Sequence, residues 1–151
     1  MHDTSVKMLS LAHTALFRLT GGIIGSRLVN NDMLLLTTTG AASGDPHTVP
    51  LLYLRDEDDL IIIASYGGRP HHPDWYHNLV NDPTTSIQIG SRRTAFVAEP
   101  MSDAEHDRWW PRIVDAYRDY AVYQSRTNRK IPVIRLTPAE RELRTSDGDG
   151  P

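Results

Sequence analysis

The stretch from Met33 to Trp75, MLLLTTTGAASGDPHTVPLLYLRDEDDLIIIASYGGRPHHPDW, decides the fold that we expect of this 151-residue chain. Met33–Thr39 is apolar and then β-branched, and it stops at a turn-rich segment, so Thr48–Leu54 should return as its antiparallel partner. Leu60–Ser65 follows a polar turn and carries a run of isoleucines, which predicts a strand that is buried on both faces. The stretch therefore predicts three strands followed by a glycine-rich loop.

Three further strands are expected later in the chain. Thr84–Ile89 and Arg93–Glu99 flank a Gly-Ser turn and predict a hairpin, and Ile131–Thr137 predicts a final strand. Six short strands joined by tight turns do not fit the alternation of strands and helices that a parallel sheet requires. We therefore expect a mainly β fold with flanking helices (α+β), built on a small antiparallel barrel.

Helices are expected on either side of the last hairpin. A short helix should run from His72 to Leu79, with a proline near its first turn. Ser102 and Glu105 form a capping-box pattern, which predicts a helix start, and Pro111 should bend that helix. A second helical piece is expected over Asp119–Thr127.

The two ends of the chain are expected to lie outside the barrel, which we assign to residues 33–137. Residues 1–32 should form an N-terminal helix and a connector, and the helix, about Val6–Leu19, is too short and too charged to span a membrane. It can pack on the barrel or on a second copy, giving a monomer or a homodimer, or it can lie on the inner membrane surface as a peripheral contact. Residues 138–151 are charged and rich in Gly and Asp, which predicts a disordered tail.

Composition narrows the classes of function. The formal net charge is −3, so the electrostatic footprint of a nucleic-acid-binding protein is missing. The chain has no cysteine, which rules out disulfides, thiolate metal sites and a cysteine nucleophile, and it fits a cytoplasmic location. Among His71, His72 and His77, the last two lie about one helical turn apart, but no third ligand follows at a suitable spacing, so no metal is predicted.

Three ordered motifs resemble the deazaflavin-dependent nitroreductase family of the split-barrel flavin reductases. They are TTTGAASGDPHTVPLLYLRD at residues 37–56, ASYGGRPHHPDWYHNLVNDP at 64–83 and YRDYAVYQSRTNRKIPVIRL at 117–136. The resemblance implies a split β-barrel like that of FMN-binding proteins. It also implies an oxidoreductase that transfers a hydride from the reduced deazaflavin coenzyme (coenzyme F-420) to a quinone, a nitroaromatic compound or an enone.

The resemblance also implies which residues form the site. Tyr117, Tyr120 and Tyr123 recur every three residues, so on a continuous helix they would spread over a third to a half of its circumference. Taken alone, this spacing is typical of core packing with each hydroxyl reaching water. In the family, however, these tyrosines line the pocket above the cofactor ring, and Tyr120, then Tyr123, is the expected proton donor. The cofactor-binding positions that the family implies are Pro50, Ser65, Tyr66, Gly67, Gly68 and Trp75.

The chain departs from the family where basic residues usually hold the coenzyme's phosphate and oligoglutamate tail. It has Ala41, Ala42 and His47 around the first turn, and Tyr66 where a lysine is common. Since a charge-assisted hydrogen bond contributes roughly 1.5–3 kcal/mol, losing several should weaken coenzyme binding. Five other basic residues are candidates to bind the coenzyme's phosphate and tail in place of the missing ones: Arg69, Arg92, Arg93, Arg126 and Lys130.

Two alternatives to the deazaflavin enzyme remain open from the sequence. The same barrel can hold flavin mononucleotide (FMN) or haem as its redox group. Without the basic anchors, the groove can instead serve as a cofactor-free pocket that binds a small molecule or acts in a biosynthetic pathway.

Overall fold

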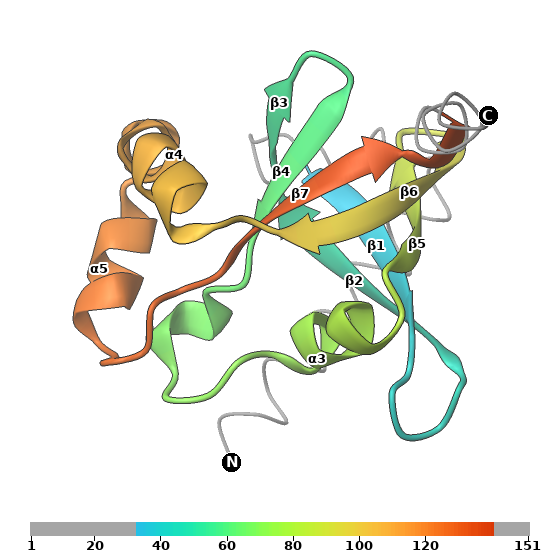
Figure 1. The fold of residues 1–151 in the computed structure, drawn as a ribbon, viewed down its shortest axis with the longest axis horizontal. Helices are drawn as coiled ribbons and strands as arrows, with labels where there is room; N and C mark the ends of the chain where they lie inside the picture. The colour runs from blue at the N-terminus through green and yellow to red at the C-terminus, as the bar shows by residue number, and fades with distance from the viewer. Residues whose placement is uncertain (1–32, 141–151) are drawn as a thin grey trace, which may run out of the picture.

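A computed structural model describes residues 33–140, which form one curled seven-stranded antiparallel sheet with helices beside it (Figure 1). The N-terminal helix predicted within residues 1–32 lies outside the described residues, as does the tail beyond residue 140. The strands are β1 (Met33–Thr39), β2 (Pro46–Leu52), β3 (Leu54–Asp56), β4 (Asp59–Ile63), β5 (Thr84–Ile89), β6 (Arg92–Pro100) and β7 (Val133–Pro138). The helices are the 3₁₀ turn η1 (Tyr66–Gly68), α3 (Asp74–Asn81), α4 (Asp103–Ala116) and α5 (Asp119–Ser125).

The order of strands in the sheet explains why it curls. The order is β2-β1-β5-β6-β7-β4-β3, so β2 and β3 are the two edges of the sheet although only Tyr53 separates them in the chain. Consecutive residues cannot span a flat seven-stranded sheet, because neighbouring strands lie about 4.8 Å apart. The sheet must therefore close on itself, and the expected small split β-barrel is confirmed.

The prediction of six strands is wrong at this corner. We expected Thr48–Leu54 to be one strand, but Leu52 pairs with Met33 of β1, whereas Leu54 pairs with Ile61 of β4. The strand breaks at Tyr53 because the residue before it pairs with β1 and the residue after it pairs with β4, which lie near opposite edges of the sheet. A local sequence pattern cannot show this change of partner.

The isoleucine run is buried on both faces, as predicted, and it separates two hydrophobic clusters. Leu60 and Ile62 point into the barrel core, where β1 and β7 also contribute leucines and isoleucines. Ile61 and Ile63 point outward and pack with Trp109, Ile113 and Tyr120 of α4 and α5. This second cluster holds α4 and α5 together on one side of the sheet, while α3 lies across the lower end of the barrel in the view of Figure 1.

The helix start at Ser102 is confirmed, since the Ser102 hydroxyl accepts a hydrogen bond from the Glu105 N–H at 3.3 Å. Pro111 lies inside α4, which continues to Ala116. The chain then turns at Tyr117, whose backbone is extended, before α5 begins. The three tyrosines therefore do not share one continuous helix. Among residues 33–140, no helix has the length and apolar character needed to cross a membrane.

Candidate functional site

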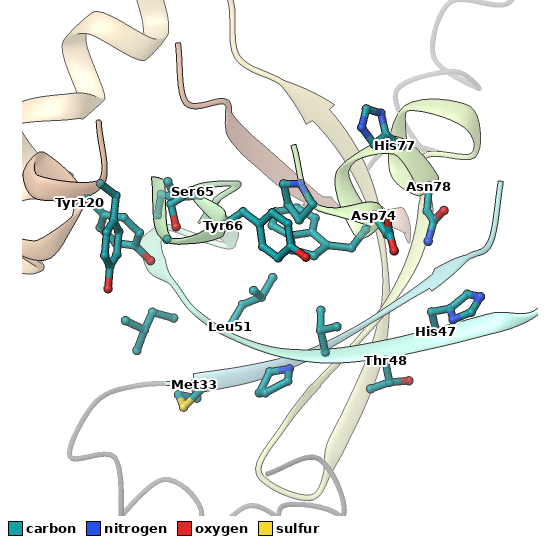
Figure 2. A pocket seen from close by; sticks show the side chains of 18 of the residues that line it. Met33, His47, Thr48, Leu51, Ser65, Tyr66, Asp74, His77, Asn78 and Tyr120 are labelled. Carbon is teal, nitrogen blue, oxygen red and sulfur yellow. The ribbon is translucent and has the colours of Figure 1, made fainter. Parts of the chain in front are cut away.

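A cavity of about 1120 Å³ lies between the barrel and the segment that links β4 to α3. Figure 2 shows its walls: Leu51, Thr48 and His47 of β2 run along one side, and Tyr66 and Asp74 face them. Tyr120 and Ser65 lie at one end, and Asn78 and His77 lie at the other. The end formed by Ser65 also includes Tyr120, which comes from a segment distant in sequence.

The structure brings eight of the nine predicted site residues to this cavity. They are Pro50, Ser65, Tyr66, Gly67, Trp75, Tyr117, Tyr120 and Tyr123. Gly68 is the exception, since it does not line the cavity. A Cβ added at Gly68 would lie 2.5 Å from the main-chain oxygen of Tyr123, so this glycine allows the loop to pack directly against α5.

The loop between β4 and α3 has an unusual backbone. Tyr66, Gly67 and Gly68 all have positive φ angles, of 48°, 63° and 79°. Two of these residues are glycines, which adopt this conformation readily, but Tyr66 is under strain there. The Tyr66 ring points into the cavity (Figure 2), and the guanidinium of Arg69 covers it at 4.6 Å from the ring centre. This backbone turns an aromatic ring toward the cavity.

Arg129 forms four hydrogen bonds to this loop, and no local sequence pattern identified it. Its guanidinium donates hydrogen bonds to the main-chain oxygens of Ala64 (3.2 Å), Ser65 (2.6 Å) and Arg69 (2.9 Å), and to Nδ1 of His72 (3.0 Å). Arg129 belongs to the third family-like motif. Nothing in the sequence shows its partners, because they lie 57 to 65 residues earlier in the chain.

The three tyrosines pack edge to face at one end of the cavity. The Tyr120 ring lies between those of Tyr117 and Tyr123, with centroid distances of 6.1 and 5.9 Å and interplanar angles of 87° and 80°. Only 7% of Tyr120 is exposed, and this burial, followed by the neighbouring phenols, raises the pKa of its hydroxyl above the usual value. Within residues 33–140, no residue hydrogen-bonds to that hydroxyl. A protonated donor is thus available to a bound molecule.

Asn78 organises the opposite end of the cavity and was also missed. Its side-chain oxygen accepts a hydrogen bond from the Ala41 N–H at 2.9 Å, and its nitrogen donates to the Thr38 hydroxyl at 3.1 Å. The turn that carries Ala41 and Ala42 lines the cavity together with His47. The turn positions where the family resemblance led us to expect basic residues therefore lie on the cavity wall, and this chain has no lysine or arginine there.

The five cations that were candidates to compensate do not line the cavity. Lys130 binds Asp103 and Asp107 at 3.1 and 3.2 Å instead. Arg126 reaches the loop from behind, where its Nη1 lies 3.5 Å from the Gly67 oxygen. Arg118, which the sequence did not single out, lines the cavity.

The histidines beside the loop have structural partners. Because a guanidinium only donates, Nδ1 of His72 must accept from Arg129, which leaves the ring proton on Nε2. Burial, followed by the charges of Arg129, His77 and His71, lowers the pKa of His72. In the described part of the chain, no three histidine, cysteine or acidic side chains gather in a way that could hold a metal ion.

Comparisons with known proteins identify the family of the chain. The sequence matches the family described as F420H(2)-dependent quinone reductase over residues 9–138. It is 43% identical over 136 residues to an F420H(2)-dependent quinone reductase of Mycobacterium tuberculosis strain H37Rv, covering 87% of this chain and 91% of the relative.

Two solved structures are similar over most of their length. One is described as an F420-H2 dependent reductase, with 40% identity, a TM-score of 0.64 and coverage of 70% of this chain and 93% of that one. The other is described as a domain-swapped dimer, with 33% identity, a TM-score of 0.66 and coverage of 89% and 95%. The resemblance to deazaflavin-dependent reductases that the three motifs indicated is confirmed.

Proposed function

Since the chain belongs to the F420H(2)-dependent quinone reductase family, we propose that it transfers a hydride from the reduced deazaflavin coenzyme to a quinone. The observation that carries the proposal is the cavity itself. One space of about 1120 Å³ is lined by the glycine loop, by Trp75 and by all three tyrosines.

The size and walls of the cavity suit two flat molecules. Pockets for ligands of drug size occupy roughly 300–1,000 Å³, so the space accommodates a tricyclic ring with an acceptor beside it. Leu51 of β2 offers an apolar surface on one side, and Tyr66 offers an aromatic surface on the other (Figure 2). Pro50 and Trp75 also line the cavity. A quinone, a nitroaromatic compound and a conjugated enone all have the flat, electron-poor shape that such walls accept.

The bound coenzyme supplies the hydride, and the protein supplies orientation and a proton. Reduction of a quinone to a hydroquinone by a hydride also requires one proton. We assign its delivery to Tyr120, because this residue lines the cavity and its hydroxyl has no hydrogen-bond partner among the described residues. Tyr123 is the second candidate, since its ring packs against that of Tyr120 on the same helix.

The acidic tail of the coenzyme should lie toward the end formed by Ala41, His47 and Asn78, which is remote from the tyrosines (Figure 2). With no lysine or arginine in the turn, this end offers the imidazole of His47 instead. We therefore expect coenzyme affinity to be weaker than in relatives that carry basic residues there.

A titration of the purified protein tests the proposal. Quenching of protein fluorescence by the oxidised deazaflavin coenzyme should saturate, and the reduced coenzyme should be consumed when menadione is added. A nitroaromatic compound and an enone, assayed beside menadione, decide between the acceptor classes. Binding of FMN with no binding of the deazaflavin at tens of micromolar, or no turnover with any acceptor, would contradict the proposal.

Oligomeric state and membrane contact stay predictions. The relative described as a domain-swapped dimer makes a homodimer the state to test first, by light scattering with and without coenzyme. Sedimentation with lipid vesicles tests the peripheral membrane contact proposed for the N-terminal helix.

A further inference from the structure

We propose that Arg129 is a positioning residue, whose side chain holds the glycine loop in the shape that forms one wall of the coenzyme site. The inference rests on the proposed function, because it assigns to Arg129 an effect on coenzyme binding. Arg129 itself does not line the cavity, so any such effect must act through the loop.

The hydrogen bonds of Arg129 are concentrated on one short segment. All four acceptors belong to residues 64–72, and three of them are main-chain oxygens. The same segment contributes Ser65, Tyr66 and Gly67 to the cavity wall. A planar guanidinium with five N–H donors can satisfy several carbonyls at fixed angles, which the single ammonium of lysine cannot do.

The loop needs such a support because its backbone is strained. Three consecutive residues have positive φ angles, and one of them is Tyr66 rather than a glycine. Conformations of this kind persist only where surrounding contacts over-determine them. Within the loop itself there are just two main-chain hydrogen bonds, from Gly68 N–H to Ser65 and from Arg69 N–H to Tyr66.

Arg129 also connects the loop to the tyrosines. The side chain of Gln124, in α5, donates to the main-chain oxygen of Arg129 at 2.8 Å and accepts from the N–H of Ile131 at 2.9 Å. The backbone of Arg129 is thereby anchored to the helix that carries Tyr120 and Tyr123. Its side chain is anchored to the loop, so Arg129 fixes the spacing between the two walls.

Arg135 is a suitable control, because it should stabilise the fold without affecting the glycine loop. It is also partly buried, but its partners are three carboxylates, those of Asp56, Asp59 and Glu105, at 2.8 to 3.1 Å. None of these four residues lines the cavity. Among residues 33–140, Arg129 makes no ion pair with a carboxylate, so its charge is matched only by carbonyl dipoles and by His72.

The test compares Arg129→Lys with the matched control Arg135→Lys in the full-length protein. The first readout is amide hydrogen exchange without any ligand. The second is the Kd for the oxidised coenzyme from fluorescence quenching, measured where thermal unfolding shows both variants fully folded.

In Arg129→Lys, residues 64–72 should lose protection selectively, and the Kd should rise by about tenfold or more. In Arg135→Lys, the melting temperature should fall, with the Kd within about twofold of that of the wild type.

Unchanged protection of residues 64–72 in Arg129→Lys overturns the inference. So does a Kd for Arg129→Lys within about twofold of that of the wild type. If the wild-type protein itself does not bind the coenzyme, the proposed function fails. The exchange measurement needs no coenzyme and still decides whether Arg129 holds the loop.

Discussion

The side-chain oxygen of Asn78, in α3, accepts a hydrogen bond from the main-chain N–H of Ala41, in the turn between β1 and β2, at 2.9 Å. The nitrogen of the same amide donates to Thr38 of β1. Only 7% of Asn78 and 2% of Thr38 are exposed, so water cannot readily replace the bond between these two side chains. Asn78 thus fixes one end of the cavity much as Arg129 fixes the other.

Replacing Asn78 with alanine should destabilise the protein by about 2 kcal/mol, because it leaves the Thr38 hydroxyl buried without its partner and frees the Ala41 N–H. Urea unfolding followed by circular dichroism measures the loss. Thr38→Val, the control, removes the other member of the pair. The double variant should then lose less stability than the sum of the two single changes. Strict additivity would show that the two side chains are not coupled.

Tyr120→Phe should leave the fold intact and impair the reaction. Within the described residues nothing hydrogen-bonds to its hydroxyl, so we expect the free energy of unfolding to change by less than about 0.5 kcal/mol. Loss of a proton donor should lower kcat for menadione reduction by about 10²-fold. Stopped-flow oxidation of the reduced coenzyme measures this directly.

Tyr117→Phe is the comparison, since the Tyr117 hydroxyl already donates to the main-chain oxygen of Tyr53 at 3.4 Å. Equal rates in Tyr120→Phe and the wild type would exclude Tyr120 as the donor.

His72 should make stability depend on pH in a defined direction. Its pKa in the folded protein is lowered, first by burial and then by Arg129, His77 and His71, so the unfolded chain binds the proton more tightly. The contribution is therefore fully present above the ordinary histidine pKa of about 6.5 and is lost as the pH falls through the lower folded value.

His72→Asn keeps an acceptor near the position of Nδ1 and removes the titration. The melting temperature of the wild type should fall between about pH 7.5 and about pH 5.5, and that of the variant should fall less over the same range. Parallel pH profiles for the two proteins would show that His72 does not contribute to the pH dependence of stability.

Gly68→Ala should destabilise the protein more than Gly44→Ala, although the two glycines have similar φ angles of 79° and 75°. At Gly44 the new Cβ would meet nothing within 4 Å, so only the backbone conformation is penalised, by about 1 kcal/mol. At Gly68 it would meet the Tyr123 oxygen at 2.5 Å and force the loop away from α5.

The additional loss at Gly68 should be about 2 kcal/mol or more, and guanidinium unfolding of both variants measures it. Equal losses at the two positions would show that the loop yields to the added methyl group without disturbing α5.

The sequence alone determined the elements whose signals are local. The isoleucines of β4 predicted a strand buried on both faces, and Ser102 with Glu105 predicted the start of α4. The three motifs pointed to the family and to residues that the structure gathers around one cavity. These features were readable because periodicity, caps and turns are encoded within a few residues of one another.

Only the tertiary structure decided which distant residues meet. The break at Tyr53 exists because the sheet closes and gives β2 and β3 different partners. Arg129 and Asn78 bond to atoms 37 to 65 residues away in the chain. The sequence also left open whether the five candidate cations reach the cavity, and the structure shows that none of them lines it. Such contacts follow from the closure of the barrel and not from any local pattern. The physical reason is that a side chain's partners are set by the packing of whole elements.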